Sequence, residues 1–273
     1  MPSIRPGFVL LRSFAVAVYV FMLAPVAVIV LLSFDAAEYA SFPPSGWTLR
    51  WFGELGKDTA IVTALKTSLI LGLSSSAIST LIGTLAAYAI TRFRLVGREG
   101  VQVFLTLPIL VPHIVLGVGL LLTFRMAGLT ASFPMLIAGH VAFTLPFVML
   151  TTIHRLQAIP RAYEEAARTL GANRFHTFRE VTLPLTLPAI AAGMLFAFMM
   201  SFDEVTATLF WLPANTQTIQ THVLAMLEYS ISQTLNALAA VLILVSVALP
   251  LLAMLLARRM TAIAIAPPSQ EAR

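Results

Sequence analysis

Six long apolar runs constrain the fold of this chain more than any other feature of its sequence. Each is about 20 residues long or longer with few charges, which is the length that an α-helix needs to cross a bilayer. A helix also satisfies its own backbone hydrogen bonds in lipid. The predicted spans are residues 14–34, 67–91, 101–124, 132–153, 186–209 and 235–257. The sequence therefore predicts an all-α integral membrane protein, with six transmembrane helices bundled in a single domain over residues 1–273.

The composition agrees with a membrane protein. Of the 273 residues 59% are hydrophobic and 11% are charged, which is too apolar for a soluble domain of this size. The net charge of +5 does not indicate a nucleic-acid partner, because the basic residues lie between apolar runs rather than on one soluble face. The chain has no cysteine, which excludes disulfides, a thiol nucleophile and a cysteine metal site.

The distribution of basic residues predicts the orientation. Thirteen of the 17 lie in segments on one side of the predicted spans, and only Arg50, Lys57, Lys66 and Arg125 lie on the other. The positive-inside rule then places both termini and the loop that follows the fourth span in the cytoplasm. The first run could also be a cleaved signal peptide. Its apolar stretch is long for that role, and its removal would leave five spans, so we expect it to be retained.

A polar cytoplasmic loop, residues 154–184, separates the fourth and fifth runs. Pro160 suits the first position of a helix and Gly171 suits a left-handed cap, so we expect a helix over 161–170. Ala166 and Ala167 lack bulk there, which would let another surface approach the backbone closely. Composition alone favours a solvated loop without a partner.

Charges flank the two alanines, and a second short helix is expected after them. Glu164 and Glu165 should present charge around the contact, together with the arginines at 161 and 168. Asn173 to Glu180 has the polarity of a second short helix. Pro184 and Pro188 are then expected to stop that helix and redirect the chain into the membrane, which would stiffen the junction.

The same loop contains a spaced motif. It consists of Glu165-Ala166-Ala167, three residues, Gly171, nine residues and Val181-x-Leu183-Pro184. It resembles the EAA loop of bacterial ABC importer permeases, in which isoleucine stands where this chain has Val181. The resemblance implies a type I permease in the bacterial inner membrane whose loop contacts an ATPase. The implied coupling residues are Glu164, Glu165, Ala166, Ala167, Gly171, Val181, Leu183 and Pro184.

The resemblance also implies that the transporter is assembled from several separate chains. The expected partners are two ABC ATPase subunits, a second permease subunit that is a different chain, a periplasmic or extracellular solute-binding protein, and membrane lipid. Neither of the chain's two lysines, Lys57 and Lys66, lies in the phosphate-binding loop pattern G-x-x-x-x-G-K-[ST]. ATP hydrolysis is therefore expected in another chain, and this one is expected to be neither an enzyme nor a cofactor carrier.

Two adjacent acids near the end of the fifth run, Asp203 and Glu204, are candidates for the solute pathway. An ionisable residue at membrane depth is costly unless it faces water or the bundle interior. A merely hydrated outer mouth remains an open alternative. The segment Ser201-Phe-Asp-Glu-Val205, with the third-run residues 104–108 and 111–117, resembles the spermidine/putrescine permease branch, which implies a polyamine as solute.

Position 113 departs from that branch, whose members often carry a carboxylate where this chain has His113. A histidine weakens the expected charge pairing with a cationic solute. His113 could line the pathway or be a neutral, hydrogen-bonded interior residue, and general experience with histidines favours the second. His140 is open to the same two interpretations.

Three other functions are compatible with some of these features. The same importer role for another small organic solute or ion stays open. A self-contained secondary transporter would show inverted repeats, and the two halves show none. A membrane-embedded metal hydrolase could use His113, His140, Asp203 and Glu204, but the chain contains neither H-E-x-x-H nor G-x-S-x-G. We therefore expect no metal site and no catalytic residue.

Overall fold

The computed structural model describes residues 6–39, 42–229 and 232–265. Among these residues there are helices and no named strand, and an isolated bridge pairs Asp35 with Trp47. The all-α class is confirmed. The chain divides into two compact units, one of Met1–Val62 with His222–Val247 and one of Thr63–Thr221 with Ala248–Arg273. The single domain over residues 1–273 stays a prediction.

The first unit contains α1 (Pro6–Leu32), α2 (Arg50–Leu55), most of α11 (Ile219–Tyr229) and the first part of α12 (Gln233–Ile265). The apolar side chains of α1 are largely exposed; Phe21, for example, is 80% exposed. A helix that is apolar on all sides and unburied is typical of a membrane span.

Asp35 organises the connection between α1 and α2. Its Oδ1 accepts hydrogen bonds from the backbone N–H and the Oγ of Ser45, both at 2.9 Å. Its carbonyl accepts a hydrogen bond from Trp51 Nε1 at 2.8 Å, so Trp51 is buried. Trp47, in contrast, is 72% exposed. Of these two aromatic residues, only Trp47 is therefore free to anchor at the membrane interface.

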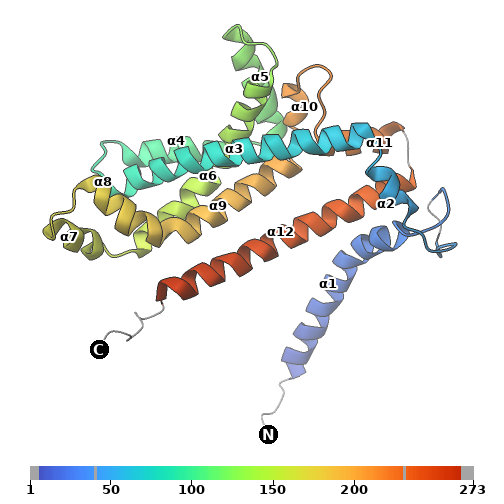
Figure 1. The fold of residues 1–273 in the computed structure, drawn as a ribbon, viewed down its shortest axis with the longest axis horizontal. Helices are drawn as coiled ribbons and strands as arrows, with labels where there is room; N and C mark the ends of the chain where they lie inside the picture. Colours follow the sequence, from blue (N-terminus) through green and yellow to red (C-terminus); the bar gives the residue numbers. More distant parts are fainter. Residues whose placement is uncertain (1–5, 40–41, 230–231, 266–273) are drawn as a thin grey trace. The chain divides into compact units, whose positions relative to one another are not determined.

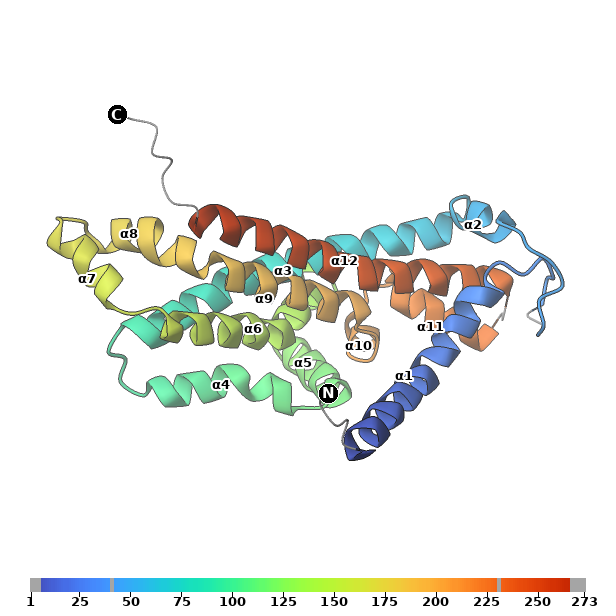
Figure 2. The ribbon, with the colours of Figure 1, turned by 90° about the horizontal axis from the view of Figure 1, so that it is seen from below.

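The second unit holds the remaining elements, which position the candidate sites. They are α3 (Thr59–Arg92), α4 (Arg98–Leu110), α5 (His113–Met126), α6 (Phe133–Ala158), α7 (Ala162–Thr169), α8 (Arg174–Thr177), the π-helical turn η1 (Phe178–Thr182), α9 (Leu183–Asp203) and α10 (Thr208–Trp211). The long helices α3, α6 and α9 run side by side (Figures 1 and 2). Glycines let them approach closely, because a Cβ at Gly83 or Gly193 would lie 3.1 Å from Val148.

Described helices coincide with most of the predicted spans. Five described helices are long and apolar enough to cross a bilayer, and a sixth span exists only if α4 and α5 count as one. These two are bent by 113°. The helix expected over 101–124 is therefore broken in two, and a single span there stays a prediction. Pro112 is the physical cause: it holds Val111 in an extended conformation and lacks the N–H that a continuous helix would use.

The prediction that Pro184 and Pro188 stop the helix and redirect the chain is also wrong. Residues from Arg174 to Asp203 form one candidate span, with Pro184 in the first turn of α9 and Pro188 inside it. Just before Pro184, the Leu183 N–H reaches back five residues to the Phe178 carbonyl. This wider π turn accommodates the proline without ending the helix. At the other end α9 stops at Asp203, six residues before the predicted end of the fifth span.

Candidate functional site

The predicted coupling helix exists as α7. It covers Ala162–Thr169, one residue shorter at each end than expected, and Pro160 lies before the helix rather than at its first position. Gly171 ends it as predicted, with a left-handed φ of +91°. The Gly171 N–H donates to the Arg168 carbonyl at 2.9 Å, which closes the last turn.

Glu164 does not present its charge to a partner, which corrects that expectation. It is 4% exposed, and its Oε1 lies 2.7 Å from Arg92 Nε and accepts a hydrogen bond from Thr182 Oγ1 at 3.0 Å. The same Arg92 guanidinium donates to the carbonyls of Leu156 and Ile159 at 3.0 and 3.3 Å. Glu164 thus anchors α7 to the ends of α3 and α6 and to η1.

The outer face of α7 is the surface left for a partner. Glu165 and Ala166 are exposed on it, and Ala167 is half-buried. Two large residues that the motif does not contain flank this face, since Tyr163 is 56% exposed and Leu170 is 89% exposed. Sequence analysis missed both, although exposed apolar residues on a short polar helix are the signal expected of a docking surface.

The end of the motif lies at the junction of η1 and α9. Val181 and Leu183 are half-buried and Pro184 is exposed. The residue between them, Thr182, makes the contact with Glu164 and is 1% exposed. The two ends of the motif are therefore joined through a residue that the pattern leaves unspecified.

Glu204 and His113 form a pair on the opposite end of α9. Glu204 Oε2 lies 2.5 Å from His113 Nδ1. The other oxygen, Oε1, accepts hydrogen bonds from Thr206 Oγ1 at 2.8 Å and from the Ala207 N–H at 2.7 Å. The Glu204 side chain is 5% exposed and that of His113 is 33% exposed. Glu204 thus ties the start of α5 to the turn that leads into α10.

Asp203 lies in a different environment from its neighbour. It is exposed, and its Oδ1 accepts a hydrogen bond from Gln220 Nε2 at 3.1 Å. Of the two adjacent acids, Asp203 is therefore the one with a carboxylate available to solvent or solute.

His140 is a hydrogen-bonded interior residue, the second of the two interpretations. It is fully buried, with Nδ1 2.8 Å from Ser201 Oγ and Nε2 3.0 Å from Thr208 Oγ1. Ser201 Oγ also lies 2.8 Å from Ser75 Oγ, so α3, α6, α9 and α10 share one polar network. In the described residues no group of three histidines, cysteines or acids is arranged to hold a metal ion.

Trp211 seats α10 against the bundle, and sequence analysis did not single it out. Its side chain is fully buried and its Nε1 donates to the Gly117 carbonyl at 2.9 Å. A Cβ at Gly139 would lie 2.4 Å from the indole ring, so α6 meets the ring with bare backbone. The turn that contains Glu204 is consequently fixed from both sides.

Comparison with known proteins decides the family. Residues 79–262 match the model of the binding-protein-dependent transport system inner membrane component. The chain belongs to this family. Spermidine/putrescine transport system permease protein PotC of Escherichia coli (strain K12) is 31% identical over 255 residues, which cover 93% of this chain and 96% of PotC. Putrescine transport system permease protein PotI of the same strain is 32% identical over 232 residues, with 82% of each chain covered.

A solved structure confirms the fold. A bacterial alginate ABC transporter, in complex with its alginate pentasaccharide-bound periplasmic protein, has a chain that superposes with a TM-score of 0.69. The two are 20% identical, and the match covers 92% of this permease and 95% of that chain. The resemblance to ABC importer permeases of the spermidine/putrescine branch is thus confirmed. The chain is a membrane permease of an ABC importer and not an enzyme.

Proposed function

We propose that this permease forms half of the translocation pathway of an ATP-driven importer for a polyamine-like cation. The observation that carries the solute assignment is its similarity to PotC and PotI over most of its length. The exposed carboxylate of Asp203 fits a cationic solute, because an opposite charge at the mouth of a pathway raises the local solute concentration.

The proposed coupling role belongs to the outer face of α7. Ala166 would let an ATPase surface approach the helix closely, while Tyr163 and Leu170 would fill hollows beside it. Movement of α7 would be passed on through Glu164, which contacts both α3 and η1. Discrete shifts of packed helices are an established route by which such pushes reorganise a bundle.

The proposed pathway role divides between the three candidate residues. Asp203 would contact the solute. Glu204 and His113 would hold the mouth in shape, since the carboxylate of Glu204 already accepts three hydrogen bonds or ion-pair contacts.

The remaining assignments follow from the charge distribution and from the family. Both termini and the loop that contains α7 would lie in the cytoplasm, in line with the positive-inside rule. Two ATPase subunits, a second permease of different sequence and a periplasmic or extracellular solute-binding protein would complete the transporter. The alginate importer in complex with its periplasmic protein supports the last of these partners.

The test begins with purification of the tagged chain from its native membranes in mild detergent and identification of the bound subunits by mass spectrometry. The recovered complex is then placed in liposomes, and ATP-dependent uptake of labelled spermidine and putrescine is measured. Uptake of either polyamine supports the proposal. ATP-dependent uptake of other solutes but of neither polyamine would leave an importer with a different solute. Uptake independent of ATP would favour a secondary transporter.

A further inference from the structure

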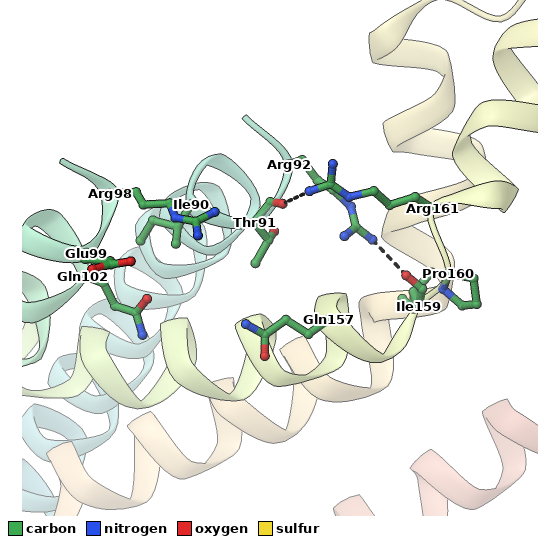
Figure 3. A pocket seen from close by; sticks show the side chains of 10 residues that line it. All are labelled: Ile90, Thr91, Arg92, Arg98, Glu99, Gln102, Gln157, Ile159, Pro160 and Arg161. Carbon is green, nitrogen blue, oxygen red and sulfur yellow. Dashed lines mark hydrogen bonds between the residues drawn. The ribbon is translucent and has the colours of Figure 1, made fainter. Parts of the chain in front are cut away.

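A polar pocket lies at the end of the second unit where α3 and α6 finish and α4 begins. Its volume is about 500 Å3, which is within the range of small-molecule sites. Figure 3 shows that Arg98 and Arg161 extend toward it from opposite walls, with the amides of Gln102 and Gln157 below them. None of the four lies in the proposed solute pathway or in the Glu164 contacts that anchor α7. Arg161, which was expected to present charge beside α7, extends toward this pocket instead.

The arginines around the pocket differ in how far they are already bound. Arg92 is held by Glu164 and by two carbonyls. One N–H of Arg161 donates to the Thr91 carbonyl at 2.8 Å, which Figure 3 draws as a dashed line. The Arg98 side chain has no hydrogen bond or ion pair with any residue that the structure describes. Two guanidinium groups therefore keep most of their donors for a ligand, against one carboxylate, Glu99, in the lining.

The depth of the pocket is set by the ends of the spans. Candidate spans finish at Arg92 and Ala158, and the bent pair begins at Arg98. Such positions lie at the level of lipid headgroups, whichever way the chain is oriented. Beyond the pocket α4 carries an exposed apolar surface, in which Val101 is 45% exposed and Phe104 is 70% exposed.

We propose that this pocket binds the headgroup of a phosphate-bearing glycerolipid. Arg98 and Arg161 would clamp the phosphate oxygens, because the guanidinium fork matches phosphate geometry. Glu99 and the two glutamine amides would accept and donate hydrogen bonds to headgroup hydroxyls and ester oxygens. The acyl chains would lie along the apolar surface of α4. Basic pockets between helices at a membrane face are typical sites of anionic lipid recognition.

Two other ligands are disfavoured by the same observations. A polyamine would be repelled by the two arginines, so the pocket is separate from the proposed solute pathway. A soluble phosphate would use the arginines but not the apolar surface of α4, which a lipid covers as well. The lipid proposal does not depend on which solute the permease carries.

The experiment is native mass spectrometry of the full chain, with whatever subunits co-purify, titrated with phosphatidylglycerol. Phosphatidylcholine and inorganic phosphate are titrated in parallel. We expect phosphatidylglycerol to bind more tightly than phosphatidylcholine. Arg98→Gln should weaken that binding about ten-fold, the cost of one charge-assisted contact. Because Arg98 has no partner among the described residues, this variant should fold normally.

Arg179→Gln is the matched control, since Arg179 is 66% exposed outside the pocket and pairs only with Glu180 among the described residues. Arg161→Gln should act like Arg98→Gln. Equal phosphatidylglycerol affinity in the Arg98 and Arg179 variants would overturn the proposal. Competition by inorganic phosphate at the same concentration as the lipid would assign the pocket to a soluble phosphate instead. Loss of the lipid whenever other subunits stay bound would make the pocket a subunit contact.

Discussion

Replacement of Glu164 by glutamine should loosen the coupling helix without unfolding the permease. The Glu164 and Arg92 side chains are 5% and 7% exposed, and their closest atoms lie 2.7 Å apart. Removal of one partner from a buried ion pair typically costs about 3–5 kcal/mol. Glutamine keeps an oxygen that Thr182 and Arg92 can still donate to, so we take the lower value, about 3 kcal/mol. At about 1.4 kcal/mol per factor of ten, local opening of α7 becomes roughly 100-fold more frequent.

Hydrogen exchange measured by mass spectrometry is the assay, because amides that exchange through local opening report its free energy directly. The amides of α7, residues 162–169, should exchange about 100-fold faster in Glu164→Gln. The control is Glu165→Gln, since Glu165 is the exposed neighbour and a surface change of this kind is worth about 0.5 kcal/mol or less. Equal exchange of α7 in the two variants would refute the anchoring role of Glu164.

A double-mutant cycle separates the ion pair from the other contacts of its members. Arg92→Gln also gives up charge-assisted bonds to the Leu156 and Ile159 carbonyls, so alone it should loosen α7 at least as much as Glu164→Gln. The double variant leaves no uncompensated buried charge. Its effect should therefore be clearly smaller than the sum of the two single effects. Strict additivity would mean that the two side chains do not interact.

Four further variants test other parts of the molecule. Gly171→Asp should insert in the membrane normally but abolish uptake. Its φ is +91°, so the backbone strain is about 1–2 kcal/mol, and its Cβ would stand in open space beside the proposed ATPase contact. Normal uptake would contradict the coupling role. Asp203→Asn should slow uptake of a polyamine while the complex assembles in normal yield, and unchanged uptake kinetics would favour a merely hydrated mouth. Glu204→Gln should instead lower the melting temperature in detergent, because it weakens contacts worth about 2 kcal/mol. Gly139→Val should lower the melting temperature by several degrees, because its Cβ would clash with the Trp211 ring and overpacking typically costs about 1–3 kcal/mol. An unchanged melting temperature would show that the ring does not pack against Gly139.

The spans were predictable because length and apolar character are local properties of the sequence. The break in the third span was also local, since Val111-Pro112 contains the proline that causes it. The behaviour of Pro184 was not local. Whether a proline ends a helix or sits in its first turn depends on the preceding backbone, and here the π turn at Phe178–Thr182 decides it. Nothing in the sequence of that turn announces a π conformation.

The sequence also did not predict which of two adjacent acids is buried. Glu164 and Glu165 are neighbours of the same type, and the motif points to both. Arg92, which lies 72 positions earlier in the chain, together with Thr182 determines that Glu164 faces inward. The same holds for Asp203 and Glu204. Glu204 is the buried one because it pairs with His113, which lies 91 positions away in the sequence. Such choices need the packed helices and do not follow from periodicity.

The two buried acids, Glu164 and Glu204, make their contacts at the two ends of one helix. That helix is α9, Leu183–Asp203, whose 21 residues correspond to roughly 32 Å of helix. At one end Glu164 accepts from Thr182 and binds Arg92, and at the other Glu204 follows the last residue of α9 and pairs with His113. A stiff helix held at both ends cannot be displaced at one end without strain at the other. In the proposed mechanism a push on α7 would therefore reach the His113–Glu204 pair, and the coupling loop and the solute pathway would act as two ends of a single moving part.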